Sequence, residues 1–206
     1  MTALPPRIQE MLDRFPRLTH CLPEIANAYE LLKTAYHADQ TVFLCGNGGS
    51  AADADHWSGE LLKGFERKRE LPPNKHTLLK ADLVAKLQGG FRAIPLTSFP
   101  ALLTAFGNDV HPDLSYAQLV WVLGRPGDVL IGLSTSGNAR NVAWAFETAR
   151  AKNMKTLLLT GQTGGKLKDI AHLSIRVPST RTLEIQELHL PIIHTLSLWL
   201  EDEFFA

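Results

Sequence analysis

Hydrophobic positions in the first forty residues recur with the period of an α-helix. Ile8, Met11 and Leu12 form one stripe. Positions 22, 25, 28, 29 and 32 form a second stripe, as is typical of amphipathic helices. The pattern predicts a pair of helices over residues 1–38 whose apolar faces need a partner. We expect them to pack on the rest of the chain or on another subunit, as an oligomerisation or packing segment.

From residue 41 onward, short apolar runs alternate with stretches of helical periodicity. The runs cover residues 41–45, 93–97, 128–134, 156–160 and 173–177, and the helical stretches include 101–106, 116–123, 142–151 and 183–204. Near-continuous apolar strands that alternate with helices are typical of a parallel sheet covered on both faces. We therefore predict an α/β fold over residues 39–206: a three-layer α/β/α sandwich around a five-stranded, mainly parallel sheet.

Composition and charge exclude several classes of protein. Of the 206 residues 45% are hydrophobic, and 21 Lys and Arg residues balance 21 Asp and Glu residues. This balance argues against a dedicated nucleic-acid binder, which normally carries a basic surplus. The chain has two cysteines, no signal peptide and no apolar run near the ~20 residues that span a bilayer. These features predict a soluble, cytoplasmic protein with no disulfide framework and no membrane partner.

A glycine-rich loop follows the first predicted strand. Residues 46–50 read Gly-Asn-Gly-Gly-Ser and lead into a helical stretch. Glycines let the backbone turn sharply and approach a ligand, and the free N–H groups of a helix N-terminus favour an anion. The loop is neither a P-loop nor, with Ala51 in place of the third glycine, a full dinucleotide fingerprint, so a dehydrogenase is disfavoured. A simple strand-to-helix turn is the alternative explanation of this loop.

A hydroxyl-rich loop follows the third predicted strand. Residues 134–138 read Ser-Thr-Ser-Gly-Asn, and hydroxyl and backbone N–H groups together bind phosphate without Lys or Arg. Taken alone, the loop is equally explained as a helix N-cap. Because parallel strands end at the same edge of a sheet, we expect the two loops to lie together there. The pair predicts a site for a phosphorylated small molecule.

Four side chains form a candidate metal or acid–base set. His56 and Glu60 are four residues apart and share one face of a predicted helix. Gln186 and His194 are eight apart, which separates them by about 80° and ~12 Å on the terminal helix. Their nitrogen and oxygen donors suit a divalent metal such as zinc. His189 is a competing candidate that spacing does not exclude, and any one histidine is also explained as structural.

Together these segments resemble the sugar isomerase (SIS) domain family, and within it the phosphoheptose isomerase family. The matching segments are residues 46–53, 107–109, 134–138 and 185–194, in order along the chain. The resemblance implies an SIS fold and an aldose–ketose isomerase that converts sedoheptulose 7-phosphate to D-glycero-heptose 7-phosphate through an enediol. It also implies a homotetramer with active sites near subunit interfaces.

The resemblance assigns roles to individual residues. Glu60 and His194 match the family's acid–base pair, and His56, Glu60, Gln186 and His194 match its metal ligands, usually described with one zinc ion per subunit. The substrate-contacting positions of the family correspond to Asn47, Gly48, Gly49, Ser50, Asn108, Asp109, Ser134, Thr135, Ser136 and Gln186.

The chain departs from the family pattern in two places. Ala139 stands where the family often has a further serine, and residues 66–92 contain an extra segment of roughly twenty residues. Part of that segment, residues 77–87, is predicted to be helical and to cover the active site or extend an interface. Two alternatives to a phosphoheptose isomerase remain open. One is an isomerase of another sugar phosphate, and the other is a non-catalytic SIS module that associates with a protein such as the replication initiator. The presence of His56, Glu60 and His194 favours an enzyme.

Overall fold

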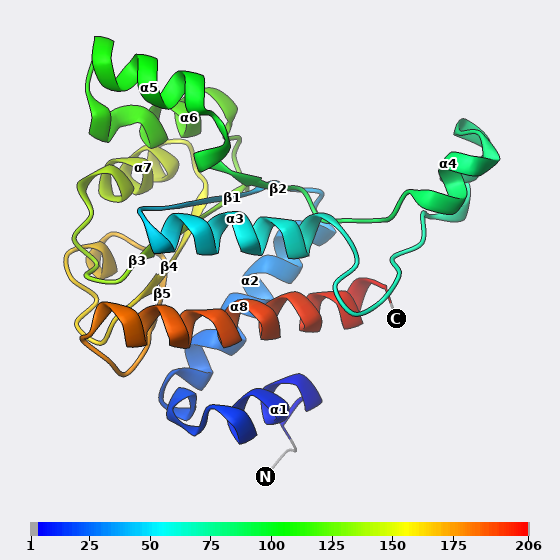
Figure 1. The fold of residues 1–206 in the computed structure, drawn as a ribbon, viewed down its shortest axis with the longest axis horizontal. Coiled ribbons are helices and arrows are strands. Elements are labelled where there is room, and N and C mark those ends of the chain that lie inside the picture. Colours follow the sequence, from blue (N-terminus) through cyan, green and yellow to red (C-terminus); the bar gives the residue numbers. More distant parts are fainter. Residues whose placement is uncertain (1–3, 206) are drawn as a thin grey trace.

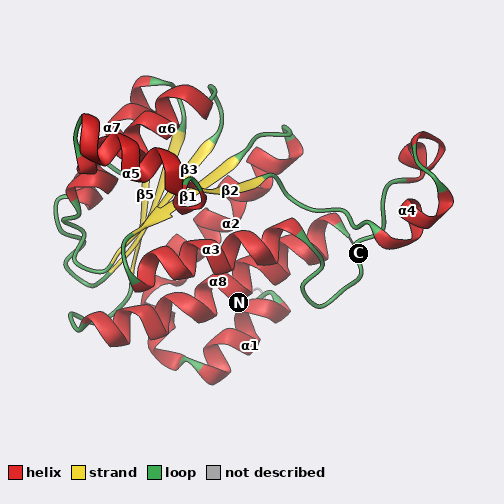
Figure 2. Ribbon diagram, turned by 45° about the horizontal axis from the view of Figure 1, so that its top comes forward, coloured by secondary structure: helices red, strands yellow, loops and turns green. Residues whose placement is uncertain are grey.

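A five-stranded parallel sheet lies between two layers of helices in the computed structural model of the protein, which describes residues 4–205 (Figures 1 and 2). Its strands are β1 (Val42–Gly46), β2 (Ala93–Pro95), β3 (Val129–Ser134), β4 (Lys155–Thr160) and β5 (Leu173–Arg176). Their spatial order is β2-β1-β3-β4-β5, and every neighbouring pair is parallel. The predicted α/β sandwich is confirmed. The second strand is shorter than predicted, because a 3-10 turn at Leu96–Ser98 follows Pro95.

The described part of the chain contains eight α-helices. They are α1 (Pro6–Arg14), α2 (Leu22–His37), α3 (Gly49–Leu62), α4 (Ala81–Lys86), α5 (Pro100–Asp109), α6 (Ser115–Leu123), α7 (Arg140–Ala151) and α8 (Thr182–Phe204). Figure 2 shows α5, α6 and α7 on one side of the strands, with α2, α3 and α8 on the other. Within residues 4–205, no helix combines the length and apolarity that crossing a bilayer requires.

The strands are apolar on both faces because each face supports a separate core. In β1, Val42 and Leu44 belong to the core beneath α2, α3 and α8. Phe43 and Cys45 belong to the core beneath α6 and α7. Successive strand side chains point to opposite faces, so burial on both sides removes the apolar–polar alternation. This explains the near-continuous apolar runs of the sequence.

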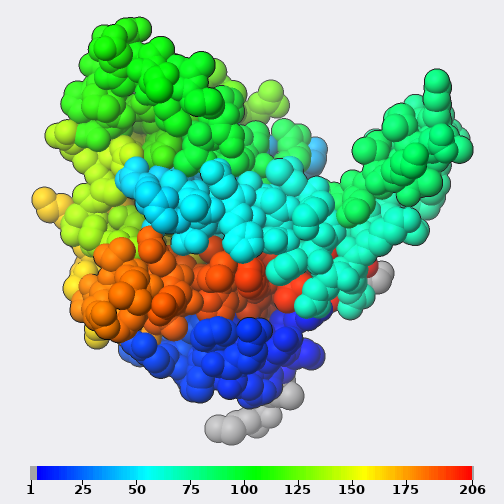
Figure 3. All heavy atoms as spheres, in the orientation of Figure 1, coloured from blue at the N-terminus to red at the C-terminus, as the bar shows by residue number. Residues whose placement is uncertain are grey.

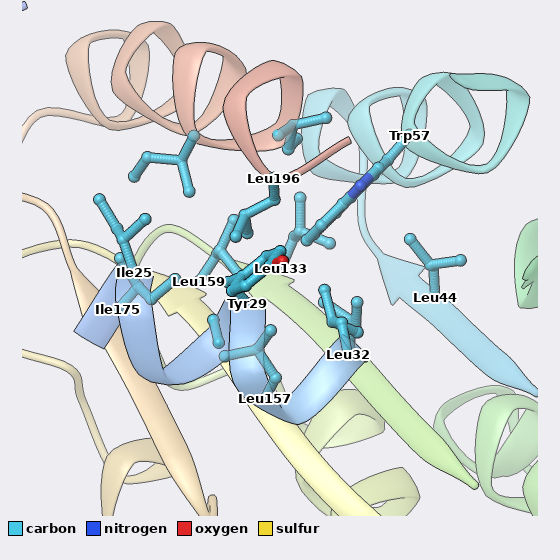
Figure 4. Packing of buried hydrophobic residues seen from close by; sticks show 14 of the residues in the cluster. Ile25, Tyr29, Leu32, Leu44, Trp57, Leu133, Leu157, Leu159, Ile175 and Leu196 are labelled. Carbon is cyan, nitrogen blue, oxygen red and sulfur yellow. The ribbon is translucent and has the colours of Figure 1, made fainter. Parts of the chain in front are cut away.

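The N-terminal helices find their apolar partner within the chain. Ile25, Tyr29 and Leu32 of α2 are buried in the same core as the strands and α8, and Figure 4 shows them beside Leu157 and Leu196. Helix α1 packs on the outer side of α8. The segment therefore contributes to the main core of the domain.

The chain after α3, where an extra segment is predicted, forms an arm that projects from the body (Figures 1 and 3). Its tip holds α4 and a 3-10 turn at Pro73–Leu78. The helix predicted over residues 77–87 is therefore only partly present. Short helices are marginal in water unless they pack against other structure, and the leucines here remain exposed, with Leu78 at 71%.

A substitution in α2 tests whether this helix shares the main core. Ile25 is fully buried, and we expect Ile25→Ala to lower the free energy of unfolding by about 2–5 kcal/mol, because it removes apolar contacts and leaves a cavity. Urea unfolding, followed by tryptophan fluorescence, measures the change. The control is Glu30→Ala on the exposed side of α2, which should change stability little. An Ile25→Ala protein with an unaltered unfolding midpoint would contradict the shared core.

Candidate active site

The glycine-rich loop turns the chain from β1 into α3 within two residues. A Cβ atom on Gly46 would lie 2.5 Å from the carbonyl oxygen of Ser50, so only glycine fits this close packing of helix on strand. Gly48 has a φ of 56° and occupies the N-cap position, which is why Ser50 lies inside the helix, buried, rather than capping it. The Tyr116 hydroxyl donates to the Gly46 carbonyl oxygen at 2.6 Å. Residues 47–49 are left exposed at the start of α3.

The hydroxyl-rich loop is held in a tight turn after β3. The backbone N–H of Gly137 donates to the carbonyl of Ser134 at 3.0 Å, and the N–H of Asn138 donates to Oγ of Ser136 at 3.2 Å. Gly137 has a φ of 65°, and a Cβ there would collide with the carbonyl oxygen of Gly164. Ser134 is buried, Thr135 is half-buried and Ser136 is exposed, so exposure increases along the loop away from the strand end.

A pair of asparagines joins the two loops. Nδ2 of Asn47 donates to Oδ1 of Asn141 at 2.9 Å, and Nδ2 of Asn141 donates to Oδ1 of Asn47 at 2.8 Å. Asn141 lies in the first turn of α7, directly after the hydroxyl-rich loop. The loops after β1 and β3 are therefore neighbours at the carboxyl edge of the sheet. Asn141 and Tyr116 are not among the site residues that the sequence predicts. The only sequence signal for Asn141 is its place just beyond residues 134–138.

Gln186 reaches this edge from α8. A Cβ on Gly49 would lie 2.5 Å from Nε2 of Gln186, so the absence of a side chain at Gly49 makes room for the amide. The amide therefore lies against the first turn of α3, next to the exposed residues of the glycine-rich loop. Its carbonyl and NH2 groups can serve as acceptor and donors for a ligand bound at the loop.

Further along the same two helices, His56, Glu60 and His194 come together. Nε2 of His56 lies 3.3 Å from Oε1 of Glu60, and the rings of His56 and His194 have centroids 5.2 Å apart. Lys63 approaches the second carboxylate oxygen of Glu60 at 3.4 Å. Helices α3 and α8 lie side by side (Figure 1), which brings residues more than 130 positions apart into one cluster.

His194 is chemically unusual within this cluster. Its ring is partly buried, and burial lowers its pKa below the ordinary value, with the neighbouring His56 adding to the effect. Among the residues that the structure describes, none bonds to the buried Nε2 of His194. A neutral ring with an unpaired nitrogen can accept or donate a proton at a bound substrate.

The predicted metal ligands form two groups. His56 lies seven residues beyond Gly49 on α3, about 10 Å along the helix axis, so the Gln186 amide is remote from the three other donors. Within residues 4–205, no group of three or more His, Cys, Asp and Glu side chains is closed tightly enough to hold a metal ion. The donor types of His56, Glu60 and His194 nevertheless fit zinc, and the unpaired Nε2 of His194 is a free ligand atom.

The remaining predicted residues lie outside the two loops and the His/Glu cluster. Asn108 and Asp109 end α5, are exposed, and bond to each other, with Nδ2 of Asn108 donating to Oδ1 of Asp109 at 2.9 Å. The structure shows no bond from them to the loops. His189 is fully buried and faces the interior, whereas His194 lies beside His56. The structure thus favours His194 over His189 as the partner of Glu60.

Comparisons with known proteins agree with this geometry. The SIS domain family model matches residues 101–198. The chain is 41% identical to the phosphoheptose isomerase of Rhodospirillum rubrum, over 94% of this chain and 93% of the relative. The chain belongs to the phosphoheptose isomerase family. The family consists of isomerases, so the expected class of enzyme is confirmed.

Solved structures of this family have the same fold. Phosphoheptose isomerase GmhA from Neisseria gonorrhoeae superimposes with a TM-score of 0.76 at 31% identity, covering 95% of each chain. A phosphoheptose isomerase from Francisella tularensis gives a TM-score of 0.78 at 29% identity, covering 95% of this chain and 94% of the other. The phosphoheptose isomerase likeness therefore extends over nearly the whole chain.

The buried His189 should make the protein sensitive to acid. Burial lowers its pKa to about 4, and the nearby Thr160 backbone opposes the shift only partly. An unfolded histidine titrates near 6.5, so protons bind preferentially to the unfolded chain between those values. We expect His189 to contribute a loss of about 3 kcal/mol of stability as pH falls from 6.5 to 4.

Urea unfolding at several pH values measures this slope. His189→Gln should flatten it, whatever its effect on stability at neutral pH. His20→Ala, at an exposed histidine, is the control and should leave the slope unchanged. An identical slope in the wild type and His189→Gln would show that other groups cause the acid sensitivity.

Proposed function

We propose that this protein converts sedoheptulose 7-phosphate to D-glycero-heptose 7-phosphate. The observation that carries the proposal is the meeting of Glu60 and His194 on neighbouring helices, in a chain of the phosphoheptose isomerase family. The site has two parts, a loop region that suits an anion and a His/Glu cluster further along α3. This division matches a substrate with a phosphate at one end and a reactive carbonyl at the other.

The two loops supply the phosphate site. Backbone N–H groups at the start of α3 and the hydroxyls of Ser134, Thr135 and Ser136 provide donors, and the positive end of the α3 dipole adds favourable potential. The Gln186 amide lies against the first turn of α3, beside this region, where it can bind sugar hydroxyls. Holding the distal phosphate fixes the sugar, so the carbonyl end stays against the acid–base pair.

Glu60 and His194 carry out the proton transfers. Isomerisation requires a base that removes the proton from C1 of the ketose and returns it to C2 through an enediol. The Glu60 side chain is only 15% exposed and takes this part. His194 moves a proton between the oxygens on C1 and C2, because its lowered pKa keeps the ring neutral near pH 7. No proton is gained or lost overall.

We also propose one zinc ion per subunit, held by His56, Glu60 and His194. Gln186, the fourth ligand implied by the family resemblance, joins this set only if its amide leaves Gly49. A zinc ion there would polarise the substrate carbonyl. The donor types and the unpaired Nε2 of His194 support the proposal.

A homotetramer is proposed on the same family resemblance. Apolar side chains that remain exposed support association, including Leu78 on the arm and Trp121 on α6. In this arrangement the segment 1–38, through its described helices α1 and α2, serves both the core of its own subunit and a contact with another. The segment 39–206 is the proposed phosphosugar-binding domain.

Isomerisation of another sugar phosphate is the second candidate function. The arm and Ala139 are the features that favour it, because one alters the surroundings of the site and the other removes a hydroxyl beside the phosphate loop. A non-catalytic module that binds the replication initiator has less support, since the acid–base pair is assembled.

The decisive experiment is turnover of sedoheptulose 7-phosphate by the zinc-supplied protein. We expect Glu60→Gln and His194→Ala each to lower kcat by about 10²–10⁴-fold, because each removes a proton-transfer group, while sugar-phosphate binding persists. Glu30→Gln and His37→Ala, at exposed positions, should behave as the wild type. Turnover of other sugar phosphates alone would favour the second candidate. A wild-type protein that is inactive on every sugar phosphate would contradict the proposal that the protein is an enzyme.

Metal content tests the zinc site separately from catalysis. After chelation and reloading, we expect one zinc ion per wild-type subunit, measured by elemental analysis and calorimetry. His56→Ala should weaken zinc binding by more than about tenfold, because it removes one of three protein ligands. His20→Ala, far along the sequence and exposed, serves as the control. Equal zinc binding by both variants would place the metal elsewhere.

A further inference from the structure

A buried ion pair lies behind Glu60 and His194, at the far end of α3 and α8. Nε of Arg69 lies 2.8 Å from Oε1 of Glu201, and both side chains are 0% exposed. Removing two charges from water is unfavourable unless nearly every polar atom is bonded. The partners of both side chains show what the pair holds in place.

Glu201 holds the turn that follows α3. Its two carboxylate oxygens accept the backbone N–H groups of Phe65, Glu66 and Arg67 at 2.8, 3.0 and 3.1 Å. Burial alone would raise the pKa of Glu201, but these bonds and Arg69 lower it below the ordinary value, so the group is ionised. One carboxylate on α8 therefore fixes three consecutive residues of the loop after α3.

Arg69 closes the carboxyl end of α3. Nη1 donates to the carbonyl of Leu61 at 2.8 Å, and Nη2 donates to the carbonyl of Glu60 at 3.0 Å. The last carbonyls of a helix lack partners within it and carry negative partial charge, so a guanidinium suits this place. Phe91 and Phe205 lie over the guanidinium at 5.0 and 5.2 Å. One of the two carbonyls belongs to the proposed base itself.

The same turn also contacts the other member of the acid–base pair. Phe65, whose N–H is bound by Glu201, places its ring 5.3 Å from the ring of His194. The ion pair is thus connected to Glu60 through a backbone carbonyl and to His194 through the Phe65 ring. The phosphate loops lie at the opposite end of α3 and share no bond with the pair in the described structure.

We propose that Arg69 and Glu201 are positioning residues that set the separation of Glu60 and His194. The inference rests on the proposed function of that pair. Displacement of a reacting group by about 1 Å can reduce the rate about 10²-fold. Because the phosphate site is remote, loss of the ion pair lowers kcat and leaves KM for the sugar phosphate nearly unchanged.

Four full-length variants test the proposal. Arg69→Lys keeps the charge beside Glu201 but lacks the fork that reaches both carbonyls. Arg69→Met leaves Glu201 buried without its cation and will unfold more readily. The double variant Arg69→Met/Glu201→Gln removes both charges. Asp202→Asn is the matched control, because Asp202 is the next residue on α8 and pairs with the side chains of Arg7 and Arg67 rather than with the backbone of the turn or the end of α3.

We expect kcat of Arg69→Lys and of the double variant to fall by about tenfold to a hundredfold, while KM stays within about twofold of the wild-type value. Arg69→Met should have a lower melting temperature, and the double variant should regain it. Asp202→Asn should keep the wild-type kcat. A double variant that regains kcat along with the melting temperature would show a merely structural pair and overturn the proposal. So would an Arg69→Lys protein with full kcat.

A readout independent of turnover separates this proposal from the proposed function. The ring signals of His194 in the NMR spectrum, assigned with His194→Ala, should shift in Arg69→Lys because Phe65 moves, and stay in place in Asp202→Asn. If the wild type turns over no sugar phosphate, the proposed function is wrong. The NMR comparison then still tests whether Arg69 and Glu201 position His194. Unshifted His194 signals in Arg69→Lys would overturn the positioning role by themselves.

Discussion

The contact between α3 and α8 is the interaction on which the candidate active site depends. Trp57 and Leu61 of α3 share a core with Leu196 and Leu200 of α8, and burial of these side chains holds the helices together against the sheet. Every polar residue of the His/Glu cluster stands on one of these two helices. Their separation therefore decides whether Glu60 and His194 can act on one substrate.

Each end of α3 is held in place by a different set of interactions. At its start, the close approach of Gly46 to Ser50 and the Tyr116 hydrogen bond set the helix on the strand edge. At its end, the carbonyls are bound by the buried guanidinium of Arg69. The arm also begins and ends here, since the N–H of Gly89 donates to the Arg69 carbonyl at 2.6 Å. The arm can thus project from the body without loosening the helix.

Much of this structure could be predicted from the pattern of residues. Five apolar runs with polar ends corresponded to the five strands, and the glycine-rich and hydroxyl-rich loops followed the strands that the pattern indicated. The structure of the arm was harder to predict, because residues 77–87 have helical periodicity but do not pack against the body of the chain. Spacing on α8 also left both His189 and His194 as candidates for the histidine beside Glu60. The helical period shows which face of the helix a residue occupies, but not which residues pack against that face.

The fold class follows from the amino-acid sequence alone, because the periodicity of apolar residues is a local property, and the family follows from the resemblance of its motifs. Three features follow from tertiary packing instead: His194 lies beside His56 while His189 is buried, Asn47 pairs with Asn141, and Glu201 binds the turn after α3. These outcomes depend on how α3, α7 and α8 pack on one sheet. Packing joins residues far apart in the chain, and no local pattern encodes such distances.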